Sequence, residues 1–188
     1  MGDPKFDRKT YESPRNPWEM KRIKDENNLR SKYGLKNKRE IWKAMSVLRS
    51  YRAKAIELQA KLRYNDVQAQ KELKELSKKL INYGMLNENS ANLDSILSLT
   101  VENILDRRLE TLVYMKGLAN TPRQARQFIV HGHISIGDRA VSIPSYMVKK
   151  EEEPLLNYKE NSPLSNELHP MRVKEAQKEE LKEGETNE

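Results

Sequence analysis

The sequence predicts an α+β protein with a helical N-terminal part, a compact module of two helices and a small twisted antiparallel sheet, and extended termini. Two observations lead to this prediction. Apolar residues recur at spacings of three and four along residues 41–83 and again along 104–113. Within "RQARQFIVHGHISIGDRA" (123–140) the helical spacing changes to alternation, which is typical of a helix followed by a β-hairpin.

The composition limits both the size of the core and the kinds of site. Of 188 residues only 36% are hydrophobic and 34% are charged, so much of the chain is expected to lie on a partner. Because cysteine is absent, disulfides and thiolate zinc sites are excluded, and we expect no metal, no cofactor and no small-molecule substrate. The sequence shows neither a long apolar run nor a signal peptide, which favours a soluble, cytoplasmic protein without membrane contact.

The net charge of +7 is distributed unevenly along the chain. Residues 1–65 contain 18 Lys and Arg against 8 Asp and Glu, and residues 100–150 contain 8 against 4. Residues 151–188 contain 5 against 11. This pattern indicates a polyanionic partner, with nucleic acid as the first candidate. Charge alone leaves open the alternative of a helical protein with ordinary solvated faces.

Residues 1–36 are expected to form a basic arm that contains one polar helix. Asn16 can cap this helix, Pro17 suits its first position, and Gly34 suits its end. The helix has almost no apolar stripe, so we expect the arm to bury little and to become ordered on a partner.

Residues 37–99 are expected to form an antiparallel helical hairpin. Asn37 and Glu40 have the spacing of a capping box, and a long helix with an apolar stripe follows them. A second amphipathic helix is expected over about 66–83, before Gly84. We interpret the apolar stripes of both helices as core.

Residues 100–150 are expected to form the compact module. One helix should run from a cap at Thr100 to Gly117. A second helix should begin after Thr121, whose side chain caps it, and end before Gly132. The hairpin follows that helix directly.

The second helix of this module has two different faces. A helical wheel places its apolar side chains on one side and Arg123, Arg126 and Gln127 on the other, so these three are expected to point outward together. In the hairpin a Gly-Asp turn pairs Ser135 with Ala140, which gives a small, polar outer face.

Residues 151–188 show no apolar stripe, and their acidic excess opposes the charge of the preceding segments. We expect an acidic, flexible C-terminal tail. Repulsion should keep this tail away from phosphates, so a basic protein or solvent is its expected neighbour.

One long stretch resembles a known family. "ILDRRLETLVYMKGLANTPRQARQFIVHGHISIGDRAVSIPSYMV" (104–148) resembles the RNA-binding module of ribosomal protein four of the small subunit, and "LDRRLETLVY", "ARQFIVHGHI" and "VSIPSYMV" are its most specific pieces. The segments "MGDPKFDRKTYESPRNPWE", "YGLKNKREIWK" and "LDSILSLTVENIL" are similar to the archaeal branch of that family. The resemblance covers roughly residues 1–150.

The resemblance implies a structural constituent of the small ribosomal subunit. Such a protein is a primary binder of small-subunit (16S) ribosomal RNA, nucleates assembly of the subunit body and contributes to translational accuracy. Small-subunit ribosomal protein number five is implied as a neighbour. Some members carry a cysteine zinc knuckle, which this chain lacks, and the usual Asn-Gly turn of the hairpin is Gly-Asp here.

The candidate contacts are mainly cations, because folded RNA is bound through its shape, phosphates and 2′-hydroxyls. The candidates are Lys5, Arg8, Lys9, Arg15, Lys21, Arg22, Lys36, Lys38, Arg39, Arg49, Arg52, Arg107, Arg123, Arg126, Gln127, His133 and Arg139. For any one of them a solvated surface position is the alternative.

No enzyme is expected. The sequence contains no Gly-rich phosphate loop, no metal-spaced His and Cys cluster, and no nucleophile with a matching His and acid. A ribosome-assembly factor built on the same fold is the closest alternative function, and a helical scaffold protein that binds no RNA is another.

Overall fold

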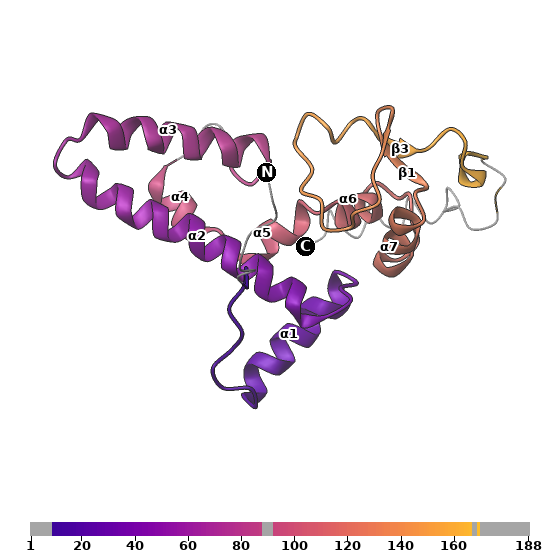
Figure 1. The fold of residues 1–188 in the computed structure, drawn as a ribbon, viewed down its shortest axis with the longest axis horizontal. Helices are drawn as coiled ribbons and strands as arrows, with labels where there is room; N and C mark the ends of the chain where they lie inside the picture. Colours follow the sequence, from indigo (N-terminus) through magenta and orange to yellow (C-terminus); the bar gives the residue numbers. More distant parts are fainter. Residues whose placement is uncertain (1–8, 88–91, 167–168, 170–188) are drawn as a thin grey trace, which may run out of the picture.

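The computed structural model describes residues 9–87, 92–166 and 169. Its helical part consists of α1 (Met20–Lys32), α2 (Lys38–Leu62), α3 (Val67–Asn82), α4 (Leu93–Ser98) and α5 (Val101–Asp106). The module that follows consists of α6 (Leu109–Met115), α7 (Pro122–Val130), β1 (Ile134–Ile136), β2 (Arg139–Ala140), β3 (Leu156–Tyr158) and the 3-10 helix η2 (Pro163–Ser165). The α+β class is confirmed. Figure 1 shows the α2–α3 hairpin at one end of an elongated molecule and the sheet at the other.

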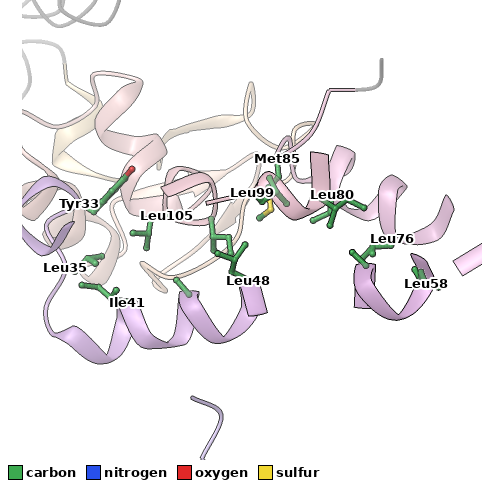
Figure 2. Packing of buried hydrophobic residues seen from close by; sticks show 14 of the residues in the cluster. Tyr33, Leu35, Ile41, Leu48, Leu58, Leu76, Leu80, Met85, Leu99 and Leu105 are labelled. Carbon is green, nitrogen blue, oxygen red and sulfur yellow. The ribbon is translucent and has the colours of Figure 1, made fainter. Parts of the chain in front are cut away.

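The helical hairpin forms where the sequence predicts it. The Asn37 side chain accepts a hydrogen bond from the Glu40 backbone N–H (3.3 Å) and so caps α2. Between α2 and α3, Asn65 adopts the left-handed backbone conformation (φ 55°), which closes the turn. Figure 2 shows side chains of both helices in one apolar core, among them Leu48, Leu58, Leu76 and Leu80.

Helix α1 differs from its prediction at the start. It begins at Met20, and the carbonyl groups of Asn16 and Pro17 instead accept hydrogen bonds from the Arg22 guanidinium (2.8 and 3.0 Å). The predicted end is confirmed, because Gly34 follows the helix with a positive φ of 65°.

The expectation that the arm buries little is wrong for its last residues. Tyr33 and Leu35, in the connection between α1 and α2, are both buried in the helical core (Figure 2). The Tyr33 hydroxyl also donates to Asp106 Oδ1 (2.7 Å). The connection therefore fastens this segment to the rest of the chain, together with the partly buried Leu29 and the buried Glu26 of α1.

The single helix expected between Thr100 and Gly117 is interrupted at Arg107 and Arg108. Arg108 has an extended backbone (φ −75°, ψ 144°) and forms an antiparallel bridge with Met147. The carbonyl of Arg107 accepts from Val148 N (3.1 Å). Main-chain hydrogen bonds to this distant segment replace those of a continuous helix, so α5 and α6 are separate.

The sheet has the order β2-β1-β3, with both pairs antiparallel. The predicted pairing of Ser135 with Ala140 is confirmed. On the other side of β1, Ile134 pairs with Tyr158 of β3. Ser135 is therefore buried, although an open outer face was expected at this position.

The strand β3 corrects the expectation of an extended tail after residue 150. Leu156 is fully buried against the module, and Leu164 of η2 is buried beside it. Leu156 and Tyr158 lie on the same face of a strand, on either side of the exposed Asn157, and provide the apolar surface that the acidic composition masks. Residues 151–166 are part of the module, whereas 167–168 and 170–188 lie outside the described residues.

Two apolar clusters divide the described chain. The first extends from Tyr33 to Leu105 and the second from Leu109 to Leu164, so the break at residues 107–108 separates them. In the part of the chain that the structure describes, no helix is both long and apolar enough to cross a membrane.

Candidate nucleic-acid interface

Helix α7 organises the candidate interface. Its start is fixed by side chains: Thr121 Oγ1 accepts from Gln124 N (3.2 Å), and Gln124 Oε1 accepts from Asn120 N (2.8 Å). The apolar face of the helix is buried as predicted, through Ala125, Phe128 and Ile129.

An exposed row runs along the opposite side of α7. Arg123, Gln127 and His131 follow one another at intervals of four residues, which places them one turn apart on the same side of the helix. All three are exposed, so the predicted outward direction is confirmed for Arg123 and Gln127.

The predicted outward direction is wrong for Arg126. Its guanidinium donates to Glu40 Oε1 of α2 (2.8 Å) and to Glu110 Oε2 of α6 (3.1 Å). Arg108 donates to the same Glu40 side chain (2.5 Å) and lies 3.4 Å from Glu110. We call these four residues the charge cluster. It joins the helical part to the module, and it directs Arg126 toward protein carboxylates.

The two carboxylates of the charge cluster respond differently to burial. Burial opposes the charge of Glu40, but the hydrogen bond from Arg126 and the charge of Arg108 outweigh it, and the pKa of Glu40 is lowered. Glu110 is fully buried, and burial raises its pKa to about 7 despite the same two guanidiniums. The negative charge of Glu40 is therefore stabilised, whereas that of Glu110 depends on pH.

A second buried carboxylate engages two further predicted contacts. Glu26 is 1% exposed and accepts from Arg22 (2.8 Å) and Trp42 Nε1 (2.9 Å), while Lys38 Nζ lies 3.2 Å from its other oxygen. Burial opposes the charge here as well, but these donors prevail and lower the pKa of Glu26. Lys38 and Trp42 thus hold the arm on α2 through Glu26, and Arg22 binds the same carboxylate from within α1, so neither predicted cation is free.

Other predicted contacts also bind protein groups. Arg107 forms an ion pair with Glu153 (2.9 Å) and lies against Gly84. Arg52 donates to the Leu99 carbonyl (2.5 Å). At the surface, Arg49 pairs with Glu12, and Lys9 donates to Ser13 Oγ (2.8 Å).

Seven other predicted contacts are exposed, and no described hydrogen bond or ion pair engages their side chains. They are Arg15, Lys21, Lys36, Arg39, Arg123, Gln127 and Arg139. Lys5 and Arg8 lie outside the described residues.

Several of these exposed cations gather around the start of α7. Gly34 packs against that start so closely that an added Cβ would lie 2.7 Å from the Pro122 Cβ. This contact brings the α1–α2 connection, which contains Lys36, and the start of α2, which contains Arg39, to the end of α7 that carries Arg123. We call Lys36, Arg39 and Arg123 the basic surface.

A hollow of about 270 Å³ lies at the other end of the exposed row. It is lined by Gln127, Phe128, His131, His133, Pro163, Leu164 and His169. His133 Nδ1 is 2.9 Å from Ser162 Oγ. The wall formed by η2 was not predicted from the sequence, although the Pro163-Leu164 pair inside the acidic segment was a signal for it.

The basic surface and the exposed row together supply guanidinium, ammonium and amide N–H donors beside a hollow lined by rings. Such donors bind phosphate and sugar oxygens. Among the described residues, no group of three or more His, Cys, Asp or Glu side chains is placed to hold a metal ion.

Comparison with known proteins identifies the family. Residues 107–154 match the S4 domain. The chain is 52% identical to small ribosomal subunit protein uS4 of Thermoplasma acidophilum over all of both chains. It is 56% identical to that of Picrophilus torridus (92% of this chain, 94% of the relative) and 49% identical to that of Methanococcus aeolicus (92% and 96%). From the fold, the interface and these identities together, the chain belongs to the family of small ribosomal subunit protein uS4.

Proposed function

We propose that the chain is a structural constituent of the small ribosomal subunit that binds small-subunit ribosomal RNA through the basic surface and the exposed row of α7. The observation that carries this proposal is the set of exposed cations around α7, within a chain that matches relatives named as subunit proteins along its length. The protein is not an enzyme, and its chemistry is the positioning of RNA.

The proposal assigns different roles to the cations. Arg15, Lys21, Lys36, Arg39, Arg123 and Arg139 are exposed and neutralise phosphates, while Gln127 donates from its amide. Arg22, Lys38, Arg107 and Arg126 hold protein segments in place and affect RNA indirectly.

The proposal extends to the place of the protein in the ribosome. Binding at this surface would occur early, nucleate assembly of the subunit body in cytoplasmic ribosomes and influence translational accuracy. Small-subunit ribosomal protein number five is the proposed protein neighbour. The names of the relatives favour a permanent constituent over an assembly factor.

The test is binding of the purified chain to isolated small-subunit ribosomal RNA at several salt concentrations, with large-subunit RNA as the competitor. We expect preference for the small-subunit RNA and a steep fall of log affinity with log salt. Equal affinity for both RNAs would contradict the proposal. Recovery of the protein in stoichiometric amounts from salt-washed subunits would separate a constituent from an assembly factor.

A further inference from the structure

The hollow at the end of α7 has one side formed by aromatic rings. The centroids of the His131 and His133 rings are 6.3 Å apart, with the planes inclined by 32°. Phe128 meets His133 edge-on, with centroids 6.3 Å apart and an angle of 88°. These contacts place neighbouring rings along the lining of the hollow.

The His133 ring is held in place by polar contacts as well. Its Nδ1 is hydrogen-bonded to Ser162 Oγ (2.9 Å), and the same hydroxyl oxygen accepts from Leu164 N (3.2 Å) at the start of η2. This bond uses Nδ1, which leaves Nε2 for another partner. The ring is thus oriented before any ligand arrives, and ordering it again would cost little on binding.

The wall of the hollow formed by η2 is apolar, whereas its rim is polar. Pro163 and Leu164 contribute apolar surface, and Gln127 contributes an exposed amide at the rim. A volume of about 270 Å³ lies just below the range of roughly 300–1,000 Å³ found for small-molecule pockets. The hollow therefore accommodates a flat group the size of one base but not a whole nucleotide.

We propose that this hollow, which we call the base pocket, takes one unpaired base of the ribosomal RNA; the inference rests on the proposed function. Sequence-specific binding of RNA uses unstacked bases that pack on rings, including histidine, and that hydrogen-bond through their edges. The amide of Gln127 supplies a donor and an acceptor for such an edge. Arg123, one turn before Gln127 in the same row, is placed for the phosphates of the same strand.

The charge and the direction of the row on α7 favour a strand of RNA as the occupant. The row on α7 runs from the exposed cation Arg123 to the ring-lined base pocket, and its members are all exposed. A strand of RNA presents phosphates and bases in the same alternation of charged and flat groups. One side chain of a neighbouring protein would fill the hollow without reaching the cation at the start of the row, whereas a strand of RNA spans both.

The experiment maps base reactivity on the complex. Small-subunit ribosomal RNA is treated with dimethyl sulfate and with a carbodiimide, which modify the base-pairing edges of unpaired bases, with and without saturating protein. We expect the parent chain to protect a nucleotide that is reactive in the free RNA. Gln127→Ala and His131→Ala should each restore its reactivity at saturation. They should weaken binding by roughly 10-fold, which is within the range for loss of one stacked base, without changing the salt slope.

The matched control is Gln70→Ala, which removes an exposed glutamine from α3, far from the hollow in sequence. It should keep the footprint and the affinity of the parent. Thermal unfolding of all variants checks that the exposed substitutions leave the fold intact.

The remaining outcomes are distinguishable. If the parent binds and both pocket variants keep its footprint and affinity, the base pocket is wrong while the proposed function stands. Unchanged binding to bare RNA with poorer incorporation into reconstituted subunits would identify a protein side chain as the occupant and overturn the inference. A parent chain that fails to bind the RNA would overturn the proposed function and the pocket with it.

Discussion

Both sides of α7 carry an arginine, and the two arginines have different surroundings. On one side Arg126 is bound to Glu40 and Glu110, in a cluster that fastens the module to the helical part. On the other side Arg123 and Gln127 are exposed along the row that leads to the base pocket. A guanidinium on a polar helix face is therefore not defined by the helix alone. The elements that pack beside it decide whether it is bound by protein carboxylates or stays exposed for a ligand.

The core of the module also depends on residues after 150. Truncation of this segment should have the largest effect on stability. Removal of 151–188 deletes the buried side chains of Leu156 and Leu164, and the loss should be at least about 4 kcal/mol of unfolding free energy. Removal of 170–188 alone should cost far less, because β3 and η2 remain. Urea unfolding of the two truncated chains measures the difference. Equal stability of the two would show that β3 is dispensable.

Arg126→Ala should have the next largest effect, on stability. It leaves Glu40 and buried Glu110 with Arg108 as their remaining partner in the cluster, and a broken buried ion pair typically costs about 3–5 kcal/mol. A double-mutant cycle with Glu40→Ala should show coupling between the two side chains. If Arg126→Ala instead keeps the parent's stability and reduces the salt dependence of RNA binding, Arg126 faces RNA as the sequence suggested.

The charge cluster should make stability depend on pH. Because burial raises the pKa of Glu110 from 4.5 to about 7, the folded state retains a proton that the unfolded state has released between these values. The contribution of Glu110 to stability is therefore greatest at low pH and falls as pH rises toward about 7, by about 3 kcal/mol in all. The low pKa of Glu40 acts in the opposite direction, since its stabilisation is lost as pH falls.

The measurement is the difference in unfolding free energy between the parent and Glu110→Gln at pH values from 4.5 to 7.5. Since Glu40 is present in both proteins, its contribution largely cancels. We expect the unfolding free energy of Glu110→Gln to increase relative to that of the parent as pH rises. A difference that stays constant with pH would mean that Glu110 titrates normally.

Arg123→Ala should have the smallest effect on stability and a clear effect on binding. The side chain is exposed and unpaired among the described residues, so the free energy of unfolding should change by less than about 0.5 kcal/mol. Loss of one phosphate contact should make the plot of log affinity against log salt shallower by about one. Together with Arg126→Ala, this variant tests directly whether the two sides of α7 differ.

Local signals in the sequence predicted the local structure well. Asn37 and Thr121 cap α2 and α7 as expected, and the Ser135–Ala140 pairing follows from the Gly-Asp turn. Each of these features depends on residues that are close in the chain. The inward and outward faces of α7 were predicted on the same basis, except at Arg126.

The features that the sequence did not reveal depend on distant residues. The partners of Arg126 come from α2 and α6, and a helical wheel contains no information about them. The interruption at Arg108 requires Met147, and burial of Leu156 requires the edge of β1. The hollow that we propose as the base pocket was missed for the same reason, since η2 lines it from a segment whose composition suggested a tail.

The position of β1 between β2 and β3 has a consequence for the order in which the chain acquires its structure. During synthesis α2 and α3 can pair as soon as both have emerged, because their contacts are close in sequence. The sheet must wait for Tyr158, and Glu40 must wait for Arg108 and Arg126 before its charge is compensated. The nascent protein should therefore pass through a stage with a formed helical hairpin and an unfinished module. In that stage α7, on which the proposed RNA contacts lie, has no stable attachment, so productive recognition of RNA should follow release of nearly the whole chain.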